Sequence, residues 1–310
     1  MSKTIAFFKF KALLELELRS FWHLLTSLEY AERWLSSLPS QPHRLDLYPG
    51  DQGYPFCSIS IPPSEFVDEK PMVKSFVHEN ALVNFVTTFE CYLFDLMERL
   101  IYVDPNLIND SDIPITAKEI VTIPPSLDTR RWLATKVSNK YLRNKTHSEM
   151  IAKLGKLTKS GVSSQLATEI EEWNKWSLVR NSIVHTSRYV TTELSTSWPQ
   201  RFPTAGAPLN LNSTELGRVP HLALKIATKI DAKAIENVIK RRDSALIIRE
   251  LFVHRGIERS SELKRVLGNL RPPKFTNPEV EKIVSDQRSG RFDDSFEISA
   301  RDLELILPRN

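Results

Sequence analysis

The sequence has few cysteines, only nine glycines and no long run of apolar residues. Its two cysteines, Cys57 and Cys91, are too few for a disulfide framework or a cysteine-rich zinc site, so we expect free thiols. The chain lacks the run of about 18 apolar residues that a membrane span needs. Lysines and glutamates interrupt the apolar stretch near its start, which argues against a signal peptide. We therefore expect a cytoplasmic protein with no membrane partner.

Several motifs of catalytic and cofactor sites are also missing. The sequence contains no GxxxxGK[ST], GxGxxG, HExxH or CxxC, which argues against P-loop, dinucleotide, zincin and zinc-ribbon sites. The seven histidines are scattered along the chain and offer no clear ligand set for a metal ion. We expect neither a bound metal nor a cofactor.

What the sequence does contain is a core-forming composition and one basic segment. With 41% hydrophobic and 26% charged residues, the chain is typical of a folded domain. The net charge is only +4, but ten basic and three acidic residues between Thr116 and Ser160 give that segment a local charge of +7. Such a segment fits a polyanion such as RNA, and a solvated helix face is the alternative. The candidates for RNA binding are Arg130, Arg131, Lys136, Lys140, Arg143 and Lys145.

Apolar residues recur at helical spacing through most of the chain, which predicts an all-α fold. Near the start, FKFKALLELEL also alternates like a strand, although we favour a helix there. The spacing predicts long helices over residues 11–38, 79–101, 126–157, 163–185 and 231–254, and shorter ones in SSELKRVLGNL, PEVEKIVSDQ and ARDLELIL.

Proline and glycine mark the expected boundaries between these helices. They predict loops over 39–63, 104–125 and 187–220, and the run CSISI inside the first loop also fits a strand. The last loop is long for a connection within one domain, so it is either functional or a boundary. We expect an N-terminal helical segment and loop over 1–62, a helical bundle over 63–190, a long loop over 191–220 and a helical region over 221–310.

One motif, RNSIVH at residues 180–185, closes the predicted helix 163–185. At about 100° per residue, Asn181 and His185 lie on nearly the same helix face. Arg180 instead shares the apolar stripe of Trp173 and Val184. Because an unpaired buried charge is costly, Arg180 needs an anionic partner, a wet cleft or a second subunit.

The same spacing occurs a second time, in Arg249 and His254. Spacing alone therefore does not choose between the two copies. Glu250 follows Arg249 directly and neutralises the local charge, whereas a polar amide, Asn181, follows Arg180. We favour the first copy as the functional one.

The fuller signature RNSIVH resembles the Arg-x4-6-His motif of the HEPN family, whose helical members are nucleases or nucleotide-binding domains. The stretch ALVNFVTTFECYLFDLMERL is similar to the aromatic-rich helix that often precedes the motif in that family. The resemblance covers roughly residues 78–190. It implies an antiparallel HEPN-like helical bundle that forms a homodimer, with the two motifs facing one another across a cleft. Arg180 would then line a groove between subunits.

The resemblance also implies a metal-independent endoribonuclease. Cleavage by the 2′-OH of RNA needs a group that titrates near neutral pH and a fixed cation, roles that suit His185 and Arg180. Asn181 would orient the imidazole or bind a phosphate oxygen. Glu90, at the edge of the apolar stripe of helix 79–101, either supports the motif or pairs with a surface lysine. The expected products carry 2′,3′-cyclic phosphate and 5′-OH ends.

The resemblance further implies a toxin or an effector of antiviral defence, held in check by an antitoxin or another regulatory protein. Family toxins that are neutralised by a nucleotidyltransferase carry a Tyr two residues after the motif His. This chain has Ser187 there, which puts that form of control in doubt. Two alternatives stay open: a catalytically silent HEPN-like module that binds RNA, a nucleotide or a protein, and a helical scaffold in which the motif is accidental.

Overall fold

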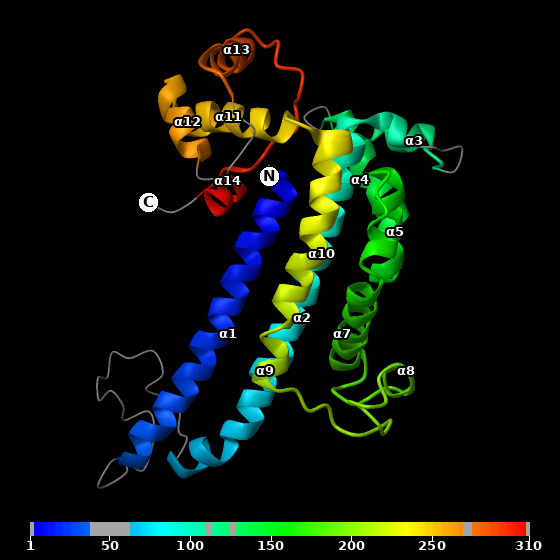
Figure 1. Ribbon diagram of the computed structural model, residues 1–310, viewed down its shortest axis with the longest axis vertical. Helices are drawn as coiled ribbons and strands as arrows, with labels where there is room; N and C mark the ends of the chain where they lie inside the picture. Colours follow the sequence, from blue (N-terminus) through cyan, green and yellow to red (C-terminus); the bar gives the residue numbers. More distant parts are fainter. Residues whose placement is uncertain (1–2, 38–62, 109–112, 125–127, 269–274, 308–310) are drawn as a thin grey trace. The chain divides into compact units, whose positions relative to one another are not determined.

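The computed structural model describes residues 3–37, 63–108, 113–124, 128–268 and 275–307 (Figure 1). These residues form helices and turns and no β-strand, which confirms the predicted all-α class. In chain order the elements are α1 (Ile5–Ser37), α2 (Pro63–Val103), the 3-10 turn η2 (Pro105–Leu107), α3 (Ala117–Val121), α4 (Thr129–Leu142), α5 (His147–Leu157), α6 (Val162–Gln165), α7 (Ala167–His185), α8 (Thr192–Ser197), α9 (Ser213–Leu216), α10 (Val219–Ala234), the π-helical turn η3 (Ile235–Ile239), α11 (Arg242–Arg255), α12 (Ser260–Gly268), α13 (Asn277–Arg288) and α14 (Ala300–Ile306).

Several predicted boundaries are wrong. The strand alternative near the start fails because α1 is helical from Ile5, and α2 begins at Pro63 instead of near residue 79. The single helix predicted over 126–157 is two helices. Asn144 adopts a left-handed backbone with φ of 60°, and the Thr146 hydroxyl accepts a hydrogen bond from the Glu149 N–H to start α5. The run CSISI lies outside the described residues.

Two predicted loops contain ordered structure. The 104–125 stretch includes η2 and α3. The 187–220 stretch includes α8 and α9, and it buries Leu194, Phe202 and Leu209. The helix predicted over 231–254 begins earlier, at Val219, and breaks at Lys240, whose φ is 54°. The short C-terminal helices were predicted correctly.

The chain divides into two compact units, each assembled from separate segments. The first comprises Met1–Leu14, Val86–Ser177 and His221–Asn310, and the second comprises Glu15–Phe85 and Leu178–Pro220. The domains predicted from the sequence are instead continuous stretches of the chain: 1–62, 63–190, 191–220 and 221–310. A helix such as α2 or α7 therefore contributes residues to both units.

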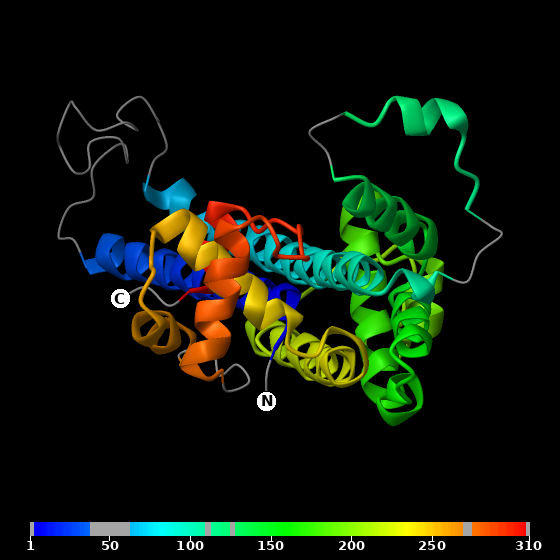
Figure 2. The same cartoon turned by 90° about the horizontal axis from the view of Figure 1, so that it is seen from above.

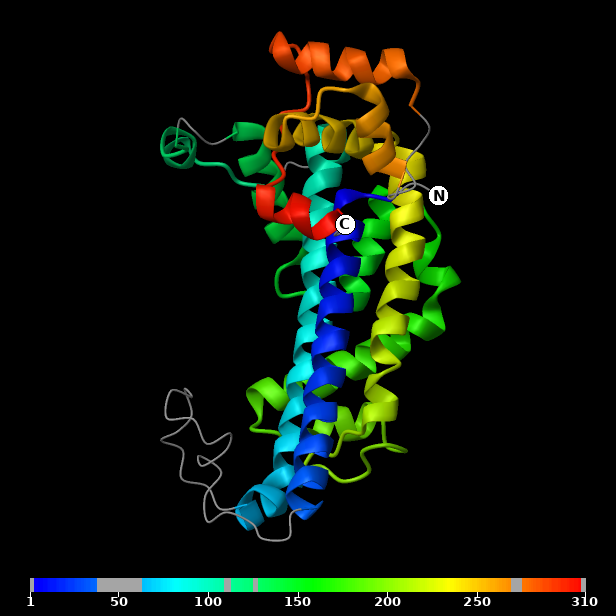
Figure 3. The same cartoon turned by 90° about the vertical axis from the view of Figure 1, so that its left-hand side faces the viewer.

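An aromatic cluster and a C-terminal helical group form the core of the first unit. Phe89 packs edge-on against Phe10 and Trp173, with ring centroids 5.9 and 4.6 Å away. Helices α11 to α14 bury a separate apolar cluster that includes Ile5 of α1 (Figure 2). Helix α14 lies beside the first turns of α1, where Lys9 Nζ is 3.7 Å from Asp302 (Figure 3).

A buried arginine ties the C-terminal group to α2 within the first unit. Arg99 donates to Asp243 through Nε at 2.7 Å and to both carboxylate oxygens of Asp294 at 3.0 and 2.6 Å. Its guanidinium also stacks over the Phe296 ring. Removing one partner of such a buried network leaves an uncompensated charge, so these residues hold the segment before α14 in place.

In the second unit, α1 and α2 pack through Phe21 and Phe85. At the surface, Lys70 bridges Glu29, at 2.7 Å, and Glu32. Gly217 packs closely, because a Cβ there would lie 3.4 Å from the Trp22 ring and 3.3 Å from the carbonyl of Ser213.

Candidate functional site

The motif RNSIVH ends α7 and belongs to the second unit. Arg180 is half-buried, and its Nε has almost no solvent contact and no hydrogen-bond partner in the described structure. Its Nη1 donates to Asn181 Oδ1 at 3.2 Å. A buried N–H without a partner is unfavourable. Arg180 Nε can therefore still donate a hydrogen bond to a further acceptor.

His185 and Asn181 are both exposed. The described hydrogen bonds include none between them, so Asn181 contacts the guanidinium of Arg180 instead of the imidazole. The apolar stripe is shorter than predicted, because Val184 is 48% exposed while Trp173 is buried. The end of α7 therefore presents its last turn to solvent, which leaves His185 free to reach a ligand.

The turn after the motif holds a further cation that the sequence did not single out. Arg188 lies with its Nε 2.8 Å from Oε2 of the buried Glu79, in the same unit. The N–H is not aligned with that oxygen, so the contact is an ion pair without a hydrogen bond. The guanidinium stacks over Phe76, 5.2 Å from the ring centroid. Neither partner could be found from spacing, because both lie on α2, far away in the sequence.

Glu90 belongs to the first unit, where its nearest ionisable partner is a buried histidine. Its Oε2 is 4.0 Å from Nε2 of His147. On the other side of the ring, Nδ1 of His147 is 2.8 Å from both Trp173 Nε1 and Ser177 Oγ. Glu90 is thus beside a fixed imidazole that the sequence did not associate with it.

The six basic candidates also belong to the first unit, and four of them contact another side chain there. Arg130 stacks on Tyr102, Arg131 contacts Glu98 at 3.3 Å, and Lys136 contacts Glu119 at 2.6 Å. The strong ion pair and the capping contacts of Thr116 lower the pKa of Glu119 to about 2. Lys145 lies 3.8 Å from Glu149. Lys140, Arg143 and Lys145 are all exposed, on α4 and the turn after it.

The second Arg–His pair is built differently from the first. Arg249 is buried, contacts Glu250, and donates to the carbonyls of Asp294 and Phe296, the latter at 2.6 Å. Its pKa is lowered by burial, which outweighs the nearby acidic groups. His254 Nε2 lies 3.1 Å from Glu250 Oε2. Because its guanidinium is bonded within the core, Arg249 serves the fold and cannot face a substrate.

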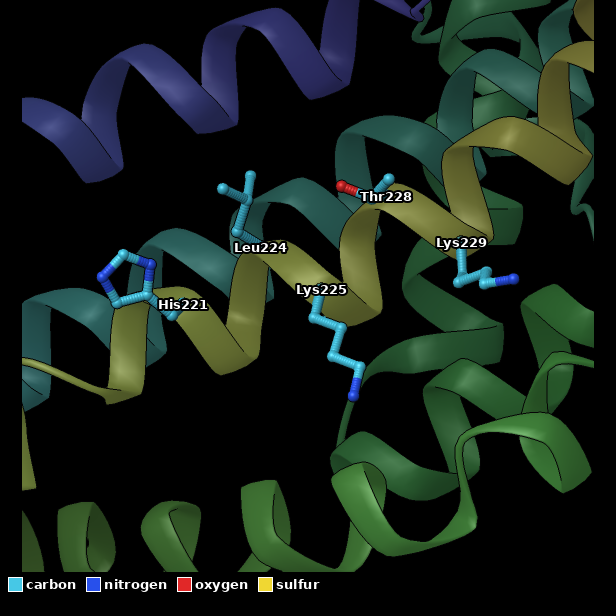
Figure 4. Close-up of a pocket in the computed structure, with 5 residues that line it drawn as sticks. All are labelled: His221, Leu224, Lys225, Thr228 and Lys229. Carbon is cyan, nitrogen blue, oxygen red and sulfur yellow. The ribbon is translucent and has the colours of Figure 1, made fainter. Parts of the chain in front are cut away.

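An open hollow of about 340 Å³ runs along α10 in the first unit (Figure 4). Its lining residues share one face of the helix: His221, Leu224, Lys225, Thr228 and Lys229. Lys225 points away from α10 and lies 2.5 Å from Glu169 of α7, whose pKa that lysine lowers. His221, Lys225 and Lys229 recur every four residues, which predicts that their side chains share one helix face. This spacing was not recognised from the sequence.

The chain matches no family model, no curated protein and no solved structure. Among the described residues, no three His, Cys, Asp or Glu side chains are grouped so as to hold a metal ion. No helix in the described ranges is long and apolar enough to cross a membrane. The resemblance to the HEPN family therefore depends on the motif and the helix before it.

Proposed function

We propose that this protein is a metal-independent HEPN-type endoribonuclease whose catalytic residues are Arg180 and His185. The observation that carries the proposal is the end of α7. A half-buried guanidinium there has an unpartnered Nε, and an exposed imidazole lies one helical turn further on. Both features suit binding and cleavage of a phosphodiester.

In this reaction the 2′-oxygen of one nucleotide attacks the adjacent phosphorus. His185 accepts the proton of the 2′-OH, and Arg180 binds the phosphate oxygens as negative charge builds up on them. The bond to the 5′-oxygen breaks, and that oxygen takes a proton from water to become a 5′-OH. Asn181 holds the guanidinium through the 3.2 Å hydrogen bond, so its proposed role is to orient Arg180. DNA lacks the 2′-OH nucleophile and is not cleaved.

The proposal extends to the protein's partners and setting. A homodimer would bring two copies of the α7 end together. RNA would follow the exposed cations Lys140, Arg143 and Lys145. Glu90 is a weaker supporting residue, because its described contact is with His147. We place the activity in the cytoplasm, as a toxin or antiviral effector under the control of an antitoxin or regulatory protein.

One observation favours a second candidate, a catalytically silent HEPN-like module that binds RNA, a nucleotide or a protein. No hydrogen bond among the described residues links Arg180 or Asn181 to His185, so the imidazole is not oriented by its neighbours. A general base usually has such an orienting partner. A binding module needs the cation but not the oriented base.

The test is incubation of the purified protein with single-stranded and structured RNA in EDTA, followed by identification of the product ends. The parent should give 2′,3′-cyclic phosphate ends, and His185→Ala and Arg180→Ala should each lower the rate by about a hundredfold or more. His23→Ala is the matched control, because His23 is also an exposed histidine of the second unit. Cleavage that survives in both motif variants rules out this site. RNA binding without cleavage supports the silent module.

A further inference from the structure

We propose that Arg188 is a phosphate-binding residue for the RNA, held in position by Glu79 and Phe76. The inference deepens the proposed function and rests on it for the identity of the ligand. It depends on three properties of Arg188: a constrained backbone, a supported guanidinium and a fork of N–H groups with no protein partner. All of the residues involved belong to the second unit.

The backbone places Arg188 at a fixed position after the motif. Ser187 and Arg188 have φ values of 52° and 74°, a left-handed region that non-glycine residues rarely adopt. The Arg188 N–H donates to the carbonyl of Ser182 at 3.3 Å, and the Thr186 hydroxyl donates to the carbonyl of Tyr189 at 2.9 Å. Two residues in succession are therefore strained, and such strain clusters at functional sites.

The guanidinium is supported on two sides. Glu79, which is only 6% exposed, holds the Nε edge at 2.8 Å, and the Phe76 ring lies beneath the plane. The side chain is nevertheless 52% exposed, and no described hydrogen bond uses Nη1 or Nη2. The guanidinium is thus held in place, while its two Nη groups are available to donate hydrogen bonds. This planar pair of donors matches two oxygens of a phosphate.

A second arginine of the same unit shows what a structural role looks like. Arg201 also stacks over a phenylalanine, Phe202, at 4.8 Å. Its Nε and Nη2 each lie 2.9 Å from an oxygen of Glu215, and Nη2 also donates to the Asn210 carbonyl. Arg201 therefore has its fork occupied by the protein, whereas the fork of Arg188 is open.

The surroundings of Arg188 also suit a nucleotide. Phe76 and Tyr189 are each 51% exposed. Bases stack on exposed aromatic rings in single-strand binding proteins, and this stacking is tolerant of sequence. Arg188 would thus bind a phosphate of the strand cleaved at His185, while a neighbouring base contacts Tyr189.

The experiment measures binding of a short fluorescein-labelled single-stranded RNA, and of the matching DNA, by fluorescence anisotropy at several salt concentrations. The parent is His185→Ala, which prevents cleavage. Adding Arg188→Ala should weaken binding of both strands about tenfold. The slope of log affinity against log salt should fall by about 0.7, as expected for one lost phosphate contact on a single strand. Arg201→Ala should leave the slope unchanged.

Two further variants separate binding from folding. Arg188→Lys keeps the charge but loses the fork and the stacking, so it should bind with intermediate affinity and an unchanged slope. Glu79→Gln should also weaken binding, because it removes the ion pair that holds the guanidinium in position. Thermal unfolding of each variant shows whether it is folded. If Arg188→Ala does not fold, the binding affinity of Arg188→Lys tests the role of Arg188.

The outcomes distinguish this inference from the proposed function. A folded protein with both His185→Ala and Arg188→Ala that binds RNA with the affinity and salt slope of His185→Ala alone overturns the role of Arg188. This holds even if the protein with His185 intact cleaves RNA. Binding that depends on Arg188 in a protein without nuclease activity supports the phosphate site and rejects the nuclease. A parent that binds neither strand overturns both proposals.

Discussion

The indole Nε1 of Trp173 donates a hydrogen bond of 2.8 Å to Nδ1 of the buried His147. Because indole N–H is only a donor, Nδ1 must accept, and the imidazole proton therefore resides on Nε2. The Ser177 hydroxyl lies at the same distance from Nδ1, and its single proton can be donated either to Nδ1 or to the Trp173 carbonyl, 3.1 Å away. Two donors thus compete for one lone pair, and either can satisfy it.

This competition predicts non-additive stability. In Trp173→Phe, the hydroxyl of Ser177 still satisfies Nδ1, and in Ser177→Ala the indole does so. The double variant leaves the buried nitrogen without a donor, so it should be less stable than the sum of the single effects by about 1 kcal/mol. Urea unfolding of all four proteins measures the difference. Additive effects would show that the two donors are independent.

Arg180→Met should separate stability from function. The substitution removes a buried N–H that has no partner and leaves an apolar chain of similar length, so the free energy of unfolding should stay the same or rise by up to about 1 kcal/mol. Cleavage of RNA should be lost. Denaturant unfolding and the EDTA assay together test this. A large loss of stability would assign Arg180 to the fold.

Burial raises the pKa of Asp231 to about 6, despite two hydrogen bonds from Thr4 that favour the charged form. An unfolded chain has the ordinary value of 3.8, so the folded protein keeps a proton that the unfolded chain releases between about pH 4 and pH 6. Stability from this group is therefore present below pH 4 and is lost as the pH rises through 6. The loss is on the order of 3 kcal/mol.

Asp231→Asn tests that pH dependence. An amide does not ionise, and its oxygen can still accept from Thr4, so the variant should show a flatter stability profile between pH 4 and 7 than the parent. At pH 7 it should be at least as stable. Urea unfolding at a series of pH values measures both quantities. An unchanged profile would mean that another group causes the dependence.

Lys240→Gly should stabilise the protein. Lys240 has φ of 54° and ψ of −114°, between the π-helical turn and α11, and its N–H donates to the Ile235 carbonyl at 2.8 Å. Glycine adopts this conformation without steric cost, so the gain should be about 1 kcal/mol. Lys240→Ala is the control for the lost side chain and should give no gain. Thermal unfolding compares the three proteins.

Part of the fold was readable from local sequence. The three- and four-residue spacing of apolar side chains predicted the helical class, the end of α7 at His185 and the short C-terminal helices, because a helix that packs on one face must repeat that spacing. The division between α4 and α5 was missed. Its signal, a Thr146–Glu149 capping box, was present in the sequence and is a stronger boundary than the apolar pattern on either side.

The sequence by itself determined the helical class and the position of Arg180 and His185 on the last turns of one helix. Only the tertiary structure decided what each charged side chain faces: Glu79 against Arg188, Glu90 beside His147, and Arg249 among core carbonyls. The physical reason is that helix formation depends on neighbours in the chain. A contact between distant residues depends on how the helices pack, which local spacing does not encode.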